Sequence, residues 1–434
     1  MSDAERGAAR GLAERRKRGP EAQPADADWL SWGARDGAHA PRLMAAVQGN
    51  WRAWHGISQF WLAALRAGGV NLWREAERQR QRMFSAPRVL SRFVAVGYAS
   101  SPSSLHEELA WLRSIGVRDV VLPIDQDGSE ACREKALTAV RNLRSEDCRI
   151  GAVLREKMGA EAHPEAWREF CQGVLVQTGW FLERAQIGSR LDERAGDKLL
   201  GRDVRQLFDL IPRLRIEYPG VAFLPPDISS IRPAAIRALR CLLPPDGRWD
   251  GLSVRLPADS SHNASGRAFL LHVALIGAVA ARAEEFGGKL QLCFAAAPLR
   301  NGDVQEAIMG GIVKRIVLAM AAGVAERVVI EVDPIQNQLR GATLTRVLHE
   351  LVSHLEGARF IRRRHVGDPG RDFVMEFHRP GTGALLVAWT EDGARPVRAG
   401  FHVREARDFL GRTVPLIPFP RLRLTETVSF FSGD

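Results

Sequence analysis

The sequence is poor in cysteine and has no long apolar run. Its five cysteines, in 434 residues, are scattered and form neither a disulfide framework nor the CxxC pairs of a zinc site. That usage favours a reducing compartment. No run reaches the roughly 18 apolar residues of a membrane-spanning helix. Residues 1–28 are polar and Ala-rich, unlike a signal peptide, so we expect a cytoplasmic protein.

The motifs of several large enzyme classes are also absent. The sequence contains no HExxH, no P-loop, no GxGxxG after a predicted strand and no GxSxG. His262 and His272 stand singly, which is more typical of packed histidines than of metal ligands. We therefore expect no cofactor and no metal.

Positive charge is present in excess, but it is unevenly placed. The net charge is +10, and residues 1–88 hold 15 Lys+Arg against 9 Asp+Glu, which is +6 of that total. Basic tails bind anionic membranes or nucleic acid in some proteins, and more often are only solvated. Because no nucleic-acid-binding motif is present, we do not expect a nucleic-acid partner.

The N-terminal part divides into two segments. Residues 1–40 are rich in Ala, Arg, Gly and acidic residues and are predicted to be a disordered basic tail. Residues 41–87 predict an amphipathic helical segment with Trp51, Trp54 and Trp61 on one face. That tryptophan face, within residues 41–83, suits a protein partner, a membrane surface or packing on the rest of the chain.

From residue 88 strands and helices alternate, which predicts a parallel α/β fold. Eight pairs in residues 88–356 match a (β/α)8 TIM barrel in size. Residues 357–434 contain closely spaced strands with Gly, Asp and Pro turns, which predict an antiparallel C-terminal β domain. The expected barrel strands are Phe93–Tyr98, Asp119–Asp125, Arg149–Glu156, Gly179–Arg190, Val221–Asp227, Trp249–Leu256, Lys289–Ala295 and Arg327–Asp333.

The fourth predicted strand ends in Gln186-Ile187-Gly188-Ser189-Arg190. This segment resembles the fourth barrel strand of the clan A retaining glycoside hydrolases, which usually reads Gln-Ile-Gly-Asn-Glu with the glutamate as general acid/base. The resemblance implies a glycoside hydrolase-like barrel with an appended β-sandwich. The segment Leu385–Thr390 looks like a strand of that appended domain.

The same resemblance implies that the catalytic pair is missing. Arg190 stands at the acid/base position, and Ala295 or Ala296 stands at the nucleophile position after strand seven. Arginine stays protonated at any useful pH and so cannot act as a general acid, and alanine cannot form a glycosyl ester. Loss of general acid catalysis alone lowers the rate by about 10²–10⁴-fold. Asp259 and Glu331 are the fallback candidates for a relocated pair.

Other polar side chains fall at or near the ends of predicted strands. Convergent arginines there suit an acidic sugar, a phosphate or a carboxylate, and they equally suit ion pairs that only fill the cleft. The candidate ligand-binding residues are Asp125, Arg155, Glu156, Gln186, Arg190, Asp227, Arg255 and Asp333.

These observations favour a glycosidase-like protein without catalytic activity. It would bind a glycan, or act as a partner protein in cell-envelope or exopolysaccharide metabolism, in the cytoplasm or at the inner membrane. An active hydrolase with relocated carboxylates and a scaffold recruited through the N-terminal helix are the alternatives.

Overall fold

The computed structural model describes residues 87–89, 92–97, 110–145, 148–157, 163–188, 206–227, 244–256, 290–294, 302–323, 325–332, 334–368, 371–381 and 383–433. The predicted tail (1–40) lies outside these ranges, as does the Trp-rich segment except for its last residue, so both stay predictions. Within these ranges, no helix is long and apolar enough to cross a bilayer.

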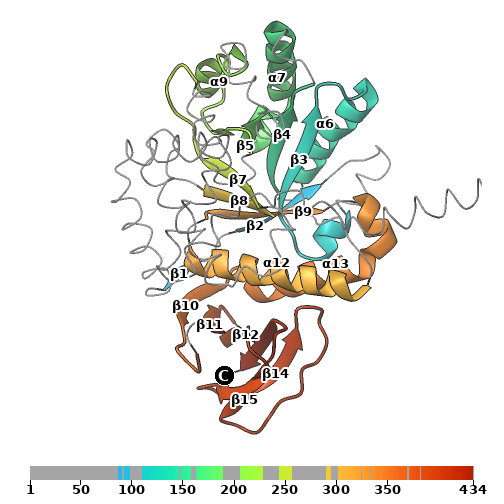
Figure 1. Cartoon of the computed structure of the whole chain (residues 1–434). Helices are drawn as coiled ribbons and strands as arrows, with labels where there is room; N and C mark the ends of the chain where they lie inside the picture. The colour runs from blue at the N-terminus through green and yellow to red at the C-terminus, as the bar shows by residue number, and fades with distance from the viewer. Residues whose placement is uncertain are drawn as a thin grey trace, which may run out of the picture. The chain divides into compact units, whose positions relative to one another are not determined.

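Eight parallel strands form one sheet, in the order β6-β5-β4-β3-β2-β9-β8-β7. Figure 1 shows helices on the outside of these strands. The strands are β2 (Arg92–Gly97), β3 (Asp119–Asp125), β4 (Arg149–Arg155), β5 (Leu182–Ile187), β6 (Ala222–Leu224), β7 (Leu252–Leu256), β8 (Leu290–Phe294) and β9 (Arg327–Val332). The helices are α6 (Glu130–Ser145), α7 (Pro164–Thr178), α9 (Ile211–Glu217), α12 (Gly302–Ala322) and α13 (Pro334–Leu355).

The sheet closes between its two end strands, β6 and β7. The backbone N–H of Asp250 donates to the carbonyl of Phe223 at 2.9 Å, and the N–H of Phe223 donates to the Asp250 carboxylate at 2.8 Å. These bonds join the start of β7 to β6 and complete the ring. The predicted (β/α)8 barrel is therefore confirmed.

Burial explains why these segments form strands. Every residue of β7 and β8 is buried, as expected for parallel strands covered on both faces. Val121, Val153, Cys293 and Val329 form a small cluster separate from the main core, because their side chains face the inside of the barrel. The outward-facing residues instead join the large core beneath the helices.

The start of the fourth strand differs from the prediction. Gly179–Phe181 forms a 3-10 turn (η4) that continues α7, and the strand begins only at Leu182. The neighbouring strand β4 begins at Arg149 and first pairs with β5 through Ile150 and Leu182. Residues before Leu182 have no neighbour to pair with, and Trp180 is left 76% exposed.

Prolines shift three further boundaries. The sequence pattern predicts a helix over Val204–Tyr218, but α9 begins at Ile211, with a proline in its first turn. β6 is only three residues long and ends before Pro225. The sequence pattern also predicts a last barrel helix over Thr343–Leu355, but α13 begins earlier, at Pro334.

The C-terminal strands form two antiparallel sheets, as predicted. A six-stranded sheet has the order β1-β10-β11-β12-β16-β14, and β13 pairs with β15. The short β1 precedes the barrel in sequence, and its pairing with β10 was not predicted. The strands are β1 (Arg88–Val89), β10 (Arg359–Arg363), β11 (Asp372–Arg379), β12 (Gly383–Thr390), β13 (Arg395–Arg398), β14 (Val403–Asp408), β15 (Arg421–Leu424) and β16 (Ser429–Gly433).

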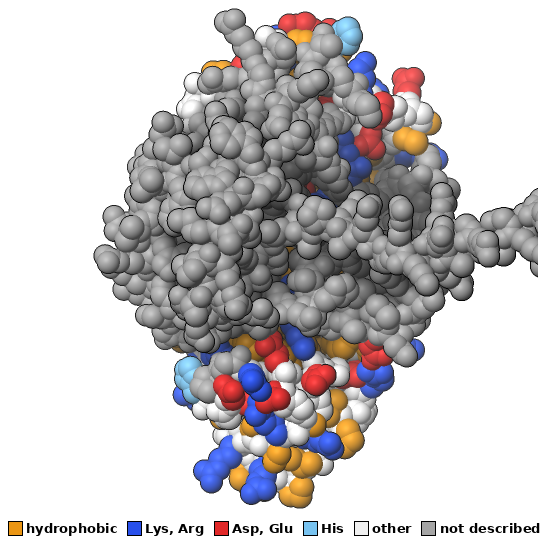
Figure 2. Space-filling view, viewed as in Figure 1, with side chains coloured by type: hydrophobic (Ala, Val, Ile, Leu, Met, Phe, Trp, Pro, Cys, Tyr) orange, Lys and Arg blue, Asp and Glu red, His pale blue; other side chains and the backbone are white. Residues whose placement is uncertain are grey.

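The larger sheet has an apolar layer on each face. Phe373 and Phe377 belong to the main core, and Phe430 stacks on His354 of α13 with ring centroids 4.6 Å apart. Val374 and its neighbours on β12 and β16 instead pack against Leu422 and the rest of the β13–β15 pair. Two layers around an apolar interior give a sandwich. Its visible outer surface carries Lys/Arg, Asp/Glu and hydrophobic side chains (Figure 2).

Glu376 on β11 is an electrostatic anchor of this domain. Its carboxylate accepts hydrogen bonds from Nε of Arg362 at 2.7 Å and from Nε of Arg364 at 2.8 Å. Burial alone would raise the pKa of Glu376, but the two arginines lower this pKa below its ordinary value of 4.5. The stability that this carboxylate contributes is present above pH 4.5 and is lost as the pH falls through the lowered pKa.

Replacing Glu376→Gln should lower the free energy of unfolding at neutral pH by about 1.5–3 kcal/mol, because hydrogen bonds to a charged group are lost. The variant should also lose less stability than the parent as the pH falls below 4.5. Guanidinium unfolding at a series of pH values measures both effects. Glu405→Gln, which removes an exposed pair with Arg407, is the control and should cost less than about 1 kcal/mol. Parallel pH profiles of parent and Glu376→Gln would contradict the assignment.

Candidate functional site

The C-terminal ends of the barrel strands carry most of the described candidate residues. In a (β/α)8 barrel this end, here called the mouth, is where ligands bind, because the βα-loops surround it. The residues that the structure places there are Asp125, Arg155, Glu156, Gln186, Asp227 and Arg255.

Asp125 and Arg155 form an ion pair at the mouth. They end the adjacent strands β3 and β4 and are directly paired in the register. Nη1 of Arg155 lies 3.5 Å from Oδ1 of Asp125, with the side chains 31% and 44% exposed. Exposed pairs of this kind contribute only about 0–1 kcal/mol, so a ligand can compete for these groups at little cost.

Asp227 and Arg255 form a second pair that is buried. Nη1 of Arg255, on β7, lies 3.7 Å from Oδ2 of Asp227, which follows β6. In the described part of the chain, Oδ1 of Asp227 is buried and accepts no hydrogen bond. A buried carboxylate needs a countercharge, so this pair fixes the two strand ends on either side of the β6–β7 seam.

Glu156 lies beside the last residues of β5. Gly188 follows β5 with φ +95, a conformation that favours glycine, and its N–H donates to the carbonyl of Leu154 at 2.9 Å. A Cβ at Gly188 would lie 3.6 Å from Oε2 of Glu156. Burial first, and then this carboxylate, raise the pKa of the Cys171 thiol. Glu156 therefore places a carboxylate beside Gly188, directly after β5.

The positions on which the catalytic prediction depends lie outside the described residues. They are Arg190, Ala295 and Ala296, together with Asp259 and Asp333, and the tryptophans at 51, 54 and 61 lie outside as well. Glu331 is described only as backbone within β9. The strands leading to positions 190 and 295 do end where the resemblance requires, at Ile187 and Phe294.

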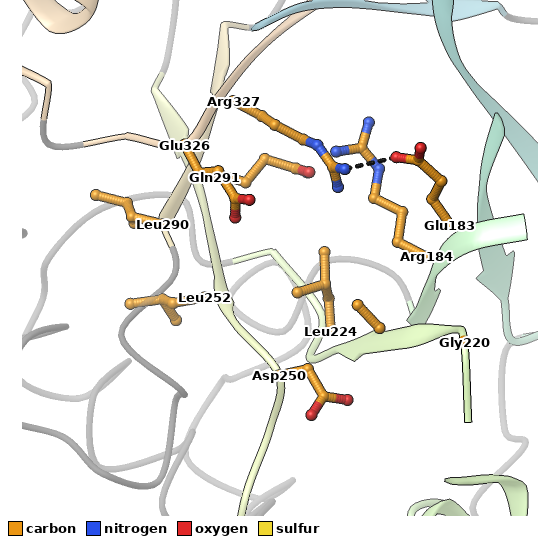
Figure 3. A pocket seen from close by; sticks show the side chains of 11 residues that line it. Glu183, Arg184, Gly220, Leu224, Asp250, Leu252, Leu290, Gln291, Glu326 and Arg327 are labelled. Atoms are coloured by element: carbon orange, nitrogen blue, oxygen red, sulfur yellow. Dashed lines mark hydrogen bonds and ion pairs between the residues drawn. The ribbon is translucent and has the colours of Figure 1, made fainter. Parts of the chain in front are cut away.

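A cavity lined by described residues lies at the opposite, N-terminal end of the barrel strands. It has a volume of about 340 Å³, and residues at the first positions of β5 to β9 line it (Figure 3). Within it, Nη2 of Arg327 donates to Oε2 of Glu183 at 2.7 Å, and Nε2 of Gln291 donates to Oγ of Ser253 at 3.1 Å. Active sites of (β/α)8 enzymes lie at the other end, so this cavity is not the place of glycosidase chemistry.

Arg184 is the buried charge of this cavity. Its side chain passes over Gly151 of β4, where a Cβ would lie 2.7 Å from the Arg184 Nε. Burial first, and then the positive charge of Arg327, lower the pKa of Arg184 to about 9. Sequence analysis missed Glu183, Arg184 and Arg327. Charged residues inside a strand that otherwise reads as fully buried were the available signal.

No family model matches the chain, and no curated protein sequence matches it. Solved structures do. A family 39 glycoside hydrolase from Bacteroides cellulosilyticus WH2 has a TM-score of 0.58 at 10% identity, covering 80% of this chain and 81% of that chain. A glucosidase from Croceicoccus marinus has a TM-score of 0.53 at 8% identity, covering 80% and 96%. A family 51 alpha-L-arabinofuranosidase from Bifidobacterium longum has a TM-score of 0.50 at 10% identity, covering 80% and 97%.

These likenesses establish the fold. The chain has the same barrel fold as these glycoside hydrolases, as the segment before Arg190 predicts. At 8–10% identity, they carry no information about which residues act.

Replacing Gly151→Ala should destabilise the barrel by about 1–3 kcal/mol, because the new methyl group would collide with Arg184. In an Arg184→Ala background the same change should cost less, leaving only the contact with Val121 at 3.1 Å. Denaturant unfolding of the parent, the two single variants and the double variant forms a double-mutant cycle, which measures the coupling between the two positions.

Gly173→Ala is the matched control for this cycle. This glycine lies in α7, and a Cβ there meets nothing within 4 Å, so alanine should stabilise by about 0.5–1 kcal/mol. An equal cost of Gly151→Ala in both backgrounds would show that Arg184 does not require the glycine.

Proposed function

We propose that this protein is a catalytically inactive glycosidase-like protein that binds a glycan at the mouth, in cell-envelope or exopolysaccharide metabolism. The fold supports the carbohydrate part of this proposal. The residues Arg190 and Ala295 or Ala296, at the positions of the catalytic pair, support the inactive part.

One observation carries most of the argument. A retaining glycosidase needs two carboxyl groups about 5–5.5 Å apart, facing each other across the sugar. At the mouth, Asp125 and Asp227 each face an arginine instead, at 3.5 Å and 3.7 Å. A carboxylate that is paired with an arginine is not available as a nucleophile or proton donor, so these pairs favour ligand binding over cleavage of a glycosidic bond.

The same pairs favour an acidic ligand. A guanidinium has five N–H donors in a fixed fork, so Arg155 can hold Asp125 and also donate to a ligand. A sugar carboxylate or phosphate offers the matching pair of acceptor oxygens. An acidic glycan is therefore the ligand class that we expect.

The other functions differ in the residues that they need. An active hydrolase with relocated carboxylates would use Asp259 or Glu331. A scaffold would use residues 41–83, through a protein partner or the membrane, and would not need the mouth.

The full-length protein should not turn over aryl glycosides. Glucosides and arabinofuranosides are the first substrates to screen, because structures of similar fold are a glucosidase and an alpha-L-arabinofuranosidase. Release of nitrophenol should stay at the rate of buffer alone. Turnover that is abolished by Asp259→Ala or Glu331→Ala, and kept by the surface change Asp392→Ala, would instead establish an active enzyme.

Acidic oligosaccharides should bind more tightly than neutral ones of the same backbone. Replacing Arg155→Gln should weaken that binding at least tenfold, because a hydrogen bond to a charged group is worth about 1.5–3 kcal/mol. A glycan array followed by calorimetry measures both effects. Arg141→Gln, on the outer helix α6, is the matched control. If Arg155→Gln binds as tightly as the parent, the ligand does not use this pair.

A further inference from the structure

The β13–β15 pair exposes a face made of arginines. The register places Arg398 directly opposite Arg421, and Arg423 opposite Pro396. The alternate residues Val397 and Leu422 are buried, so the arginines share the outer face. Like charges directly opposite each other repel. Within the described residues, no ion pair is found for any of these three arginine side chains, and all three residues are exposed.

Acidic residues are absent from this part of the sequence. Residues 393–404 and 409–425 contain six Lys+Arg and no Asp or Glu. The net charge of the chain is +10, of which residues 1–88 carry +6. The two stretches carry another +6, so the remaining residues together have a net charge of −2.

Large apolar side chains lie beside the arginines. Leu416 and Phe419, in the loop before β15, are 47% and 61% exposed. The ring of Phe419 lies 6.0 Å from that of His402, and the N–H of Ala399 donates to the carbonyl of Pro420 at 2.9 Å. The loop is thus tied to the end of β13. Figure 2 shows Lys/Arg and hydrophobic side chains next to each other at the end of this domain.

We propose that this basic tip, formed by Arg398, Arg421, Arg423, Leu416 and Phe419, binds the surface of a bilayer that contains anionic phospholipids. The arginines contact lipid phosphates, and Leu416 and Phe419 enter the interface between headgroups and acyl chains. A soluble polyanion would use the arginines but would gain little from an exposed leucine. The tip is distinct from the mouth and from residues 41–83, so the proposal is independent of the proposed function.

Vesicle sedimentation with the full-length protein tests the proposal. The parent should sediment with vesicles of equal parts phosphatidylcholine and phosphatidylglycerol, and only weakly with phosphatidylcholine alone. The triple change of Arg398, Arg421 and Arg423 to Gln should lower partitioning by on the order of a hundredfold, at about fivefold per arginine. Leu416→Ala with Phe419→Ala should lower it roughly tenfold without changing its salt dependence.

Arg359→Gln is the matched control, because Arg359 is an exposed arginine on β10 of the other sheet. It should bind vesicles like the parent, and thermal unfolding should show all variants folded. The proposal is overturned if the parent does not sediment with anionic vesicles. It is also overturned if both tip variants bind like the parent and only alanines at Trp51, Trp54 and Trp61 abolish binding. Arginine-dependent binding that Leu416→Ala and Phe419→Ala leave unchanged would overturn the insertion of these two side chains into the bilayer.

Discussion

Charge inside the barrel is the constraint on which the rest of this structure depends. Arg327 and Glu183 come from opposite sides of the ring, and their ion pair closes its N-terminal end. Arg184 adds a second guanidinium next to the first, at a cost visible in its pKa of about 9. The barrel tolerates this arrangement because Gly151 leaves room for the side chain and because Glu183, Glu326 and Asp119 supply negative charge nearby. Burial in turn raises the pKa of Asp119, so neither sign of charge is well solvated at this end.

The two ends of the barrel therefore have different chemistry. At the N-terminal end, the charged side chains are held in fixed positions around a small cavity. This is expected of residues that stabilise the fold. At the mouth the Asp125–Arg155 pair is partly exposed, whereas the Asp227–Arg255 pair is buried and anchors the seam. In the proposed function, an anionic ligand would exchange with the first pair and be oriented by the second. Such binding would need only the arginines and the barrel that positions them.

The sequence predicted the barrel well because parallel strands that are buried on both faces read as unbroken apolar runs, such as Leu290–Phe294. It predicted the antiparallel sheets for a related reason, since strands so close together leave no room for crossover helices. It failed at Gly179–Phe181, where an apolar run looks like a strand but has no neighbour to pair with, and at β1, whose partner is some 270 residues away. The Gly151–Arg184 contact could not be predicted either, because it depends on the register between β4 and β5. The identity of position 190 could be read directly, but the group that its side chain meets could not.

The two sheets of the C-terminal domain serve different purposes. One layer of the sandwich must pack on the barrel, so Phe373, Phe377 and Phe430 are apolar and buried. The outer face of the β13–β15 layer does not pack on the barrel. The hydrophobic contacts of this layer are made by its inner face, through Val397, Leu422 and Leu424. Arg398 and Arg421, for which no acidic partner is found among the described residues, lie directly opposite each other, and their repulsion weakens the fold. Exposed residues that weaken a fold are best explained by what they bind, and the neighbouring leucine and phenylalanine support the proposed partner, a surface with both phosphate and hydrocarbon.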